Sequence, residues 1–454
     1  MSSQIPHIQN WEGSIDLLPS VIVKPRNIDE LINIVKNNQK YPSPLRPSGS
    51  RHSTTKCAVA DGGTLVDMRN MNKIIEINEN TVRVEAGCLF IDVAQELRKC
   101  GMQFYVNVEI GNISMGSAAT CGTKDASFYG EFGQMASYIE EVKMINGKGE
   151  IITINESSPD DLQAVRSSYG LYGIVFEVTI KIKKIQSLKV YHKTYSIEEF
   201  EFIHPQLCKS EESLMFYLFP FEDKITIEYR SYLDRDICFF RNPFIWKFRN
   251  FVWKKFAPAV GYLLTSFIPC KKIAYRGVDV LNKIIRACLD KVICSKNTYA
   301  NDQIIRYPEE KGISKYTFSI WAFPEEGYPK ILKAYFDFCK EYYRNTGYRC
   351  NILNVGYRIS KDQNPLFSYS YDGHVMTADP VATGGKGWDD FLKAYNDFCS
   401  EFDGIPMFNQ SKHLNRKLVK GAFGERIETF KKIRLKFDSD NRFLNEYFKQ
   451  LFDI

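Results

Sequence analysis

Residues 46–53, Arg-Pro-Ser-Gly-Ser-Arg-His-Ser, combine small side chains, a proline and a histidine in one short stretch. Glycine and serine leave the backbone accessible, so their N–H groups can approach a phosphate closely. The imidazole of His52 can act as a nucleophile or as a hydrogen-bond partner. This composition predicts a loop that holds a phosphate-bearing cofactor, and it raises the question of whether His52 is bonded to that cofactor.

A second stretch, residues 111–123, contains no charged residue and consists mostly of small side chains. Such a sequence also permits close approach of the backbone to a ligand. Two such loops suit an extended cofactor that is held at two places. The pattern is neither a GxGxxG fingerprint after a first strand nor a P-loop, because no GKS or GKT occurs. A Rossmann-type dinucleotide site is therefore disfavoured.

Short strands and two amphipathic helices must position these loops. A strand at 21–25 and a helix at 28–38 precede the first loop, and Asn27 or Asp29 can cap that helix. A second helix is predicted over 88–100, just before the second loop. The other elements predicted here are strands at 64–68, 74–77 and 81–84, a hairpin of 139–145 with 151–154, a helix at 160–165 and a strand that runs through Ile180.

The character of the chain changes after Lys184. Aromatic strands alternate with amphipathic helices from there on, and we place a domain boundary near residues 184–190. The predicted organisation is a first domain over 1–184, a second over 185–423 and a C-terminal segment over 424–454. The elements predicted in the second and third parts are strands at 215–219, 225–229 and 317–322 and helices at 328–343, 388–402 and 424–437.

Bulk composition excludes several classes of protein. The net charge of +6 over 454 residues is too dilute to indicate a nucleic-acid binder. The twelve cysteines form no CxxC pair and no zinc-type cluster, which favours reduced thiols over a disulfide framework and predicts no metal site. The N-terminus lacks a signal-peptide apolar stretch, and no uncharged segment is long enough to span a bilayer. We therefore expect a cytoplasmic protein.

The order of motifs in residues 20–182 resembles the PCMH-type FAD-binding domain of the vanillyl-alcohol oxidase superfamily of flavoproteins. Within it, the chain is similar to the aldonolactone and alditol oxidase branch. The motifs that carry the resemblance are Gly49–Ser53, which matches Gly-x-x-His-Ser, then Met68–Asn72, Val84–Gly87, Gly111–Thr123 and Gly170–Val175.

The resemblance implies an α+β fold in which a two-lobed FAD-binding domain is joined to a cap domain built on an antiparallel sheet. Phe219-Pro220 and residues 321–324 look like cap strands, and residues 443–445 look like the end of a chain that returns to the FAD domain. The cofactor-binding residues that it implies are Pro47, Ser48, Gly49, Ser50, Arg51, His52, Ser53, Gly111, Asn112, Ser114, Met115, Ser117, Ala118, Cys121, Gly122, Thr123, Gly173, Ile174, Val175 and Asn445.

His52 stands where these oxidases form a histidyl bond to the 8α-methyl group of the flavin. The resemblance therefore implies covalent FAD, since an imidazole nitrogen can attack the activated methyl group and the bond raises the flavin potential. The alternative is a histidine that only hydrogen-bonds FAD, because some relatives lack the bond.

The chain departs from the family pattern in two places, the second loop and one cap strand. Relatives have Gly-Thr-His-Gly in the second loop, whereas residues 122–125 read Gly-Thr-Lys-Asp. Relatives place a Glu-x-Arg pair on a cap strand, but the strand Asn354–Arg358 lacks the glutamate. These departures leave the substrate open, as well as the choice between an oxidase and a dehydrogenase.

The predicted catalytic residues are Lys412 and Arg358. Relatives carry a lysine facing the flavin near the C-terminus, and Lys412 matches it, although Gln410 fits an ungapped alignment. A cation there would stabilise negative charge on the reduced flavin or on a substrate alkoxide. The alternatives are a solvated surface lysine and a cap-surface arginine. Tyr357 and His374 are weaker candidates for proton transfer.

Residues 237–278 contain no acidic residue and interleave eight basic with nine Phe and Trp side chains. This pattern favours peripheral contact with a membrane. The uncharged core at 256–270 is too short to span a bilayer. The alternative is a cap segment whose aromatic side chains line the core or a substrate tunnel, and RNA binding is the least favoured option.

We therefore predict an FAD-dependent, aldonolactone oxidase-like enzyme. It would transfer a hydride from a CH–OH carbon of a sugar, polyol or lactone-like substrate to flavin N5, and oxygen or a quinone would reoxidise the flavin. One alternative is oxidation of a hydrophobic or lipid-linked alcohol at a membrane. An alternative of another class is a membrane-associated flavin-binding scaffold without turnover.

Overall fold

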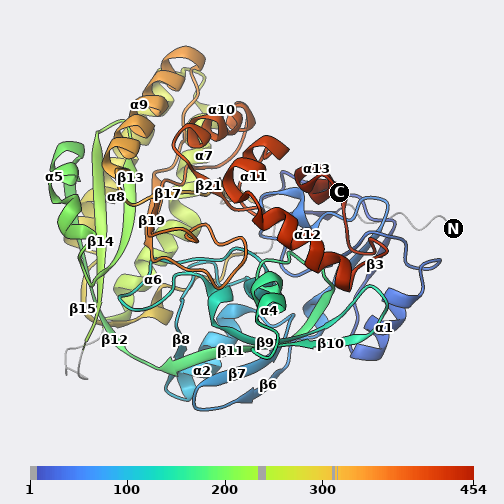
Figure 1. Cartoon of the computed structure of the whole chain (residues 1–454). Coiled ribbons are helices and arrows are strands. Elements are labelled where there is room, and N and C mark those ends of the chain that lie inside the picture. The colour runs from blue at the N-terminus through green and yellow to red at the C-terminus, as the bar shows by residue number, and fades with distance from the viewer. Residues whose placement is uncertain (1–7, 234–241, 309–311, 314) are drawn as a thin grey trace.

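The chain folds into two parts, a first lobe and a cap, each with its own strands and helices. The computed structural model describes residues 8–233, 242–308, 312–313 and 315–454 (Figure 1). The first lobe contains a three-stranded parallel sheet and a six-stranded antiparallel sheet, and the cap contains an eight-stranded antiparallel sheet. This arrangement confirms the predicted α+β class.

The parallel sheet leads directly into the first loop. Its order is β3 (Val21–Val23), β5 (Thr64–Asp67) and β4 (Leu45–Ser48). Helix α1 (Ile28–Lys36) covers it and begins where predicted, because the Asn27 side chain accepts a hydrogen bond from the Glu30 N–H at 2.9 Å. A two-stranded sheet of β1 (Ile8–Gln9) and β2 (Asp16–Leu17) precedes it.

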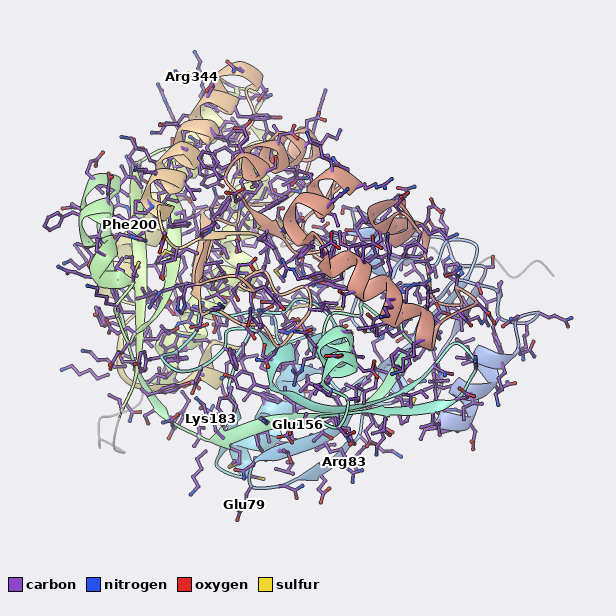
Figure 2. All side chains as sticks on the ribbon, viewed as in Figure 1. Glu79, Arg83, Glu156, Lys183, Phe200 and Arg344 are labelled. Atoms are coloured by element: carbon purple, nitrogen blue, oxygen red, sulfur yellow. The ribbon has the colours of Figure 1, made fainter. Side chains whose placement is uncertain are left out.

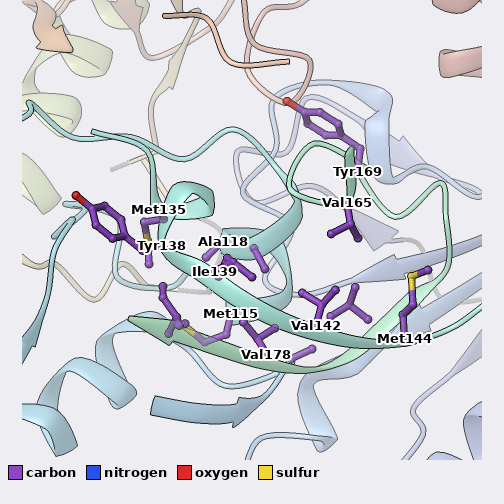
Figure 3. Close-up of a cluster of buried hydrophobic side chains, with 14 of the residues drawn as sticks. Met115, Ala118, Met135, Tyr138, Ile139, Val142, Met144, Val165, Tyr169 and Val178 are labelled. Atoms are coloured by element: carbon purple, nitrogen blue, oxygen red, sulfur yellow. The ribbon is translucent and has the colours of Figure 1, made fainter. Parts of the chain in front are cut away.

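The six-stranded sheet forms the floor of the first lobe. Met115 and Ala118 pack on one face of it, against Val142 and Val178 (Figure 3). The strands run in the order β10 (Ile151–Ile154), β9 (Ile139–Ile145), β11 (Ile174–Lys184), β7 (Thr81–Glu85) and β6 (Ile74–Ile77), with β8 (Met102–Phe104) beside β11, and the helices are α2 (Phe90–Lys99), α3 (Met115–Thr120) and α4 (Pro159–Val165). The predicted 139–145/151–154 hairpin is confirmed.

The cap sheet is buried on both faces, which explains why β13 (Ser213–Phe219) is apolar throughout. Leu214, Phe216 and Leu218 point to one core and Met215, Tyr217 and Phe219 to the other, as the two-residue period of a strand requires. Its strand order is β15 (Ser295–Tyr299), β12 (Ser187–Ser196), β14 (Lys224–Tyr232), β13, β18 (Asn354–Ile359), β19 (Val375–Thr377), β17 (Trp321–Pro324) and β21 (Ile405–Pro406).

Helices cover both faces of the cap sheet. Phe200 packs from α5 into one core, and charged side chains such as Arg344 point outwards (Figure 2). On that face lie α5 (Ile197–Leu207), α9 (Tyr328–Thr346) and α10 (Trp388–Glu401), and on the other face lie α6 (Pro243–Phe251), α7 (Ala257–Phe267) and α8 (Lys271–Lys291).

One predicted strand is wrong. Residues 317–322 do not form a single strand, because β16 (Thr317–Phe318) pairs with β20 (Val381–Ala382) in a separate small sheet, whereas β17 joins the cap sheet. Between β16 and β17, the Ser319 N–H donates to the carbonyl of Pro380. The chain passes there from pairing with β20 to pairing with β19.

The C-terminal helices return to the first lobe. In Figure 1 the red helices α11 (Arg416–Phe423), α12 (Arg426–Phe437) and α13 (Glu446–Phe452) stand beside the first lobe. Phe430, Phe448 and Phe452 share a core with residues of β9 and β11. Phe423 of α11 belongs to the same core, so the return begins before residue 424.

Candidate active site

Both predicted loops line one cavity between the lobes. Small residues of the first lobe form one wall, and aromatic and apolar residues of the cap form the other. The contributing segments are 46–53, 108–124 and 169–175 of the first lobe, 215–217, 253–258, 316–320 and 352–381 of the cap, and 407–410 near the C-terminus.

Most of the predicted cofactor residues lie in the cavity wall. Those that line it are Pro47, Ser48, Gly49, Ser50, Arg51, His52, Ser53, Ser114, Ser117, Cys121, Gly122, Thr123, Gly173 and Val175. The other six lie behind the wall, where they have structural contacts. Met115, Ala118 and Ile174 are core residues, Asn112 bonds the backbone of Tyr307, Gly111 packs against Ile304, and the Asn445 amide donates to three carbonyls at 56–59.

The two loops contact each other closely at Gly49. A Cβ atom at this position would collide with the side chain of Ser114, so the approach requires glycine. Arg46 holds the start of the first loop, since its buried guanidinium donates to the carbonyls of Cys57, Gly170 and Phe443. These contacts fix the positions of the two loops relative to each other.

The first loop also binds the C-terminal segment. The hydroxyls of Ser53 and Thr55 donate to the carbonyls of Asn409 and Phe408 at 2.8 and 2.6 Å. Thr54 Oγ1 donates to the carbonyl of Gln410 at 2.8 Å. As a result, Asn409 and Gln410 line the cavity beside His52 and its neighbours.

The chemistry of the wall fits FAD. Ser50 Oγ and His52 Nε2 are buried and have no hydrogen-bond partner among the described residues, although both residues line the cavity. Buried polar atoms are normally paired, so these two are available to a ligand. Together with the glycine-dependent approach of the loops, they suit a cofactor that carries phosphates and a polar ring.

His52 is neutral in this environment. Burial, and to a smaller extent the charge of Lys315, lowers the pKa of His52 from 6.5 to about 3. Trp11 stacks on the imidazole, with ring centroids 4.8 Å apart and an interplanar angle of 22°. The Trp11 indole N–H donates to the carbonyl of Pro308, which holds the stack in place. A neutral imidazole keeps a lone pair for bonding.

Lys124 and Asp379 form an ion pair in the cavity wall. Lys124 Nζ lies 3.0 Å from Asp379 Oδ2 and 3.5 Å from the centre of the Tyr357 ring. Burial lowers the pKa of Lys124 and raises the pKa of Asp379 to about 6, although the lysine opposes the latter shift. Lys124 is the residue at which the second loop departs from the family pattern.

A buried charge network behind the cap wall was missed from the sequence. Arg230 bonds Glu228 Oε1 and Asp125 Oδ2 at 2.5 and 2.8 Å, and Tyr217, which lines the cavity, donates to Glu228 at 2.9 Å. Burial raises the pKa of Glu228, but Arg230 and His192 outweigh it and hold that pKa well below its ordinary value. The signal was present, because Glu228 and Arg230 are two charged residues on the same face of a strand, next to the apolar residues Ile225, Ile227 and Tyr229.

Neither predicted catalytic cation lies in the cavity wall. Arg358 donates to Glu325 Oε1 at 2.5 Å and to the carbonyls of Cys208 and Ser210. Lys412 Nζ lies 2.8 Å from Glu12 Oε1. The catalytic assignment of both stays a prediction, and their positions do not support it.

The weaker candidates separate in the same way. Tyr357 and Gln410 line the cavity, whereas His374 does not and instead accepts a hydrogen bond from the Lys361 N–H. Three of the polar residues considered near the flavin therefore line the cavity. They are Gln410, Tyr357 and Lys124, the last of which replaces the histidine of the family pattern.

The basic aromatic segment has two sides. Trp253, Ala257 and Pro258 line the cavity, and Trp253 stacks on Tyr217 with a centroid distance of 5.7 Å. The large apolar side chains that the segment exposes are Phe244, Phe248, Phe251, Phe256, Leu263, Phe267 and Ile273. Residues 237–241 of the predicted segment lie outside the described residues. Within the described part of the chain, no helix is long and apolar enough to cross a bilayer.

Comparisons with known proteins agree with this site. The sequence model of a family described as "FAD binding domain" matches residues 19–155, which contain both loops. The chain is 28% identical over 229 residues to D-arabinono-1,4-lactone oxidase of Kluyveromyces lactis, covering 48% of this chain and 42% of that protein. It is 26% identical over 224 residues to L-gulono-1,4-lactone dehydrogenase of Mycobacterium tuberculosis, covering 48% and 50%.

The chain thus spans about half the length of these relatives. It is also 22% identical over 454 residues to L-gulonolactone oxidase of Mus musculus, with 98% of each chain covered. Among solved structures, the fold is similar to cholesterol oxidase from Brevibacterium sterolicum, with a TM-score of 0.76, 14% identity and coverage of 100% of this chain and 99% of that one. These similarities support the resemblance to the aldonolactone oxidase branch of the vanillyl-alcohol oxidase superfamily of PCMH-type FAD-binding proteins.

Proposed function

We propose that the protein is an FAD-dependent oxidoreductase that oxidises a CH–OH carbon of a sugar, polyol or lactone-like substrate. The observation that carries the proposal is one cavity in which both cofactor loops face an aromatic and apolar cap wall that also holds the carboxyl group of Asp379. The names of the relatives agree with it, since they act on aldonolactones. Oxygen or a quinone would serve as the final electron acceptor.

The first lobe would hold FAD. Backbone N–H groups of residues 48–53 would face its phosphates, with Ser114 and Ser117 on the opposite side. When bound, FAD supplies a hydride acceptor to the cavity. The cap residues would orient the alcohol and exclude water, because Tyr217, Tyr357 and Val355 close the cavity from the other side.

We further propose that FAD is linked covalently through His52. The support is a neutral, buried imidazole whose Nε2 has no partner among the described residues. Acid precipitation tests the bond. We expect the yellow colour to stay with the precipitated protein and to pass to the supernatant in His52→Ala, whereas colour in the supernatant of the wild type would leave His52 only a hydrogen-bonding role.

The catalytic cations predicted from the sequence take structural roles in this proposal. Arg358 and Lys412 each have an ion-pair partner outside the cavity wall. A group that acts on substrate must reach the reacting atoms. The proposal therefore assigns the chemistry to polar residues that line the cavity.

A second candidate is the oxidation of a hydrophobic or lipid-linked alcohol at a membrane. The observation that favours it is the segment 242–278, which lines the cavity with Trp253 and exposes Phe251 and Phe267 on its outer side. These residues bring an apolar surface and the cavity wall onto one helical segment. Lysines and arginines without acidic neighbours in sequence would favour an anionic lipid surface.

Anaerobic flavin reduction separates these candidates. The holoenzyme would be mixed with L-gulono-1,4-lactone, D-arabinono-1,4-lactone, xylitol and farnesol, and the flavin absorbance followed before and after oxygen is readmitted. We expect bleaching by a lactone or polyol. Bleaching by farnesol alone would favour the hydrophobic alcohol, and bleaching by none of the four would favour a scaffold without turnover. Recovery of the colour with oxygen would identify an oxidase.

A further inference from the structure

The Lys124–Asp379 ion pair is buried in the cavity wall. Its side chains are 3% and 2% exposed, and both residues line the cavity. Burying two charges costs more than a surface pair, and apolar replacements of such pairs are often neutral or stabilising. A buried pair at a cavity is therefore better explained by chemistry than by stability.

The backbone already anchors Asp379 without its side chain. Its N–H donates to the carbonyl of Val355 at 2.7 Å, and the Val355 N–H donates back at 3.0 Å. This exchange fixes the turn after β19 against β18. The carboxyl group is thus held in the wall and takes no part in this backbone exchange.

The two carboxylate oxygens of Asp379 differ in their hydrogen bonds. Oδ2 accepts hydrogen bonds from Lys124 Nζ at 3.0 Å and from Thr377 Oγ1 at 3.1 Å. Oδ1 is buried and has no partner among the described residues. One oxygen therefore orients the carboxylate, and the other keeps its lone pairs for a donor such as a substrate hydroxyl.

Lys124 keeps this carboxylate ionised. Its ammonium lies 3.5 Å from the centre of the Tyr357 ring, whose face attracts a cation. Without the lysine, burial alone would favour the protonated acid, which cannot accept a proton. Lys124 comes from the second cofactor loop and Asp379 from the cap, so the pair joins the two walls.

We propose that Asp379 is the catalytic residue that accepts the hydroxyl proton of the substrate, and that Lys124 positions it and keeps it ionised. The inference rests on the proposed function. The substrate loses its O–H proton to Asp379 Oδ1 and its C–H hydrogen with two electrons to the flavin, so that an alcohol becomes a carbonyl. The proton leaves Asp379 for solvent after the product departs.

Burial raises the pKa of Asp379 to about 6, close to neutral pH. Burial raises the pKa values of its other titratable neighbours, which stay neutral. Those neighbours are Tyr328, Tyr357, Tyr369, Tyr395 and Cys399. Asp125, which lies near Lys124, is paired with Arg230.

The test compares four variants of the holoenzyme. Asp379→Asn removes the base, Asp379→Glu restores a carboxylate, and Lys124→Met removes the positioning charge. The matched control is Asp279→Asn, which breaks the cap ion pair with Arg349 and does not line this cavity. Anaerobic flavin reduction by the best alcohol of the panel would be measured from pH 5 to 9, together with FAD content.

We expect Asp379→Asn to reduce flavin about 10²–10⁴-fold more slowly, with unchanged FAD content and without the acid limb of the pH profile. Asp379→Glu should recover part of the rate. Lys124→Met should move the acid limb to higher pH, because loss of a nearby cation raises the pKa of a carboxyl. It should therefore regain activity in alkaline buffer, which a merely structural defect would not do.

Infrared difference spectra give a readout that is independent of turnover. As the pH is lowered, a carboxylic acid band should appear near pH 6 in the wild type and already at higher pH in Lys124→Met. The band should be absent in Asp379→Asn. Reduction of Asp379→Asn at the wild-type rate, or a slow variant that keeps the acid limb, would overturn the inference alone. A wild-type flavin that no alcohol reduces would overturn the proposed function and this role with it, even if the band titrates as expected.

Discussion

The indole ring of Trp11 stacks on the imidazole ring of His52, with centroids 4.8 Å apart. Trp11 lies in the turn between β1 and β2, and its backbone N–H donates to the carbonyl of Arg51 at 2.8 Å. A residue from the N-terminal hairpin thus forms one side of the site that holds the candidate flavin tether. The stack leaves the imidazole few orientations.

Replacing Trp11 by leucine should slow formation of the flavin bond. An aromatic stack contributes about 1 kcal/mol, so we expect the bond to form about fivefold more slowly. The measurement is the time course of acid-stable flavin after FAD is added to flavin-free protein. Trp11→Phe is the matched control and should keep most of the rate, and an unchanged time course in Trp11→Leu would show that the stack does not position His52.

Loss of protonation at His52 makes stability depend on pH. The folded-state pKa of about 3 lies below the unfolded value of 6.5, so the unfolded chain binds more protons between these values. Stability is therefore complete above pH 6.5 and falls as the pH decreases, by about 3 kcal/mol at pH 4. Thermal unfolding of flavin-free wild type and His52→Gln across this range should show a shallower decrease in the variant, and parallel curves would contradict the shift.

Local sequence patterns were enough to predict the two cofactor loops. The charged residues in and behind the cavity wall depend on contacts between segments far apart in the sequence. The small residues at 46–53 and 111–123 indicate close backbone approach by their composition alone, and the structure brings both stretches to one cavity. The pairing of Lys124 with Asp379 depends on the packing of the second loop against the cap, which no local pattern encodes. The family pattern predicts a Glu-x-Arg pair on β18, whereas the structure has a Glu-x-Arg pair, Glu228-x-Arg230, on β14.

Substitutions of Arg358 and Lys412 separate structural from catalytic roles. Each side chain is mostly buried beside a carboxylate, Glu325 or Glu12, and removal of one partner leaves a buried charge unpaired. We expect Arg358→Met and Lys412→Met each to destabilise the fold by about 3 kcal/mol, with the rate of flavin reduction nearly unchanged. Stopped-flow reduction and thermal unfolding check this together. Slow reduction at unchanged stability and FAD content would restore the catalytic assignment.

The exposed face of α6 and α7 should bind anionic lipid vesicles. Phe244, Phe251 and Phe267 are 73%, 52% and 71% exposed, and burial of one phenylalanine in an apolar phase contributes about 2 kcal/mol. Replacing all three by serine should therefore weaken binding to phosphatidylserine-containing vesicles by more than about 100-fold, as measured by cosedimentation. Phe202→Ser is the matched control, because Phe202 is 81% exposed on α5, which covers the opposite face of the cap sheet. The lysines of the segment should make binding fall with added salt. Equal binding of the triple variant and the wild type would remove the membrane from the proposed function, and equal loss in the Phe202 variant would show that the contact is not specific to this face.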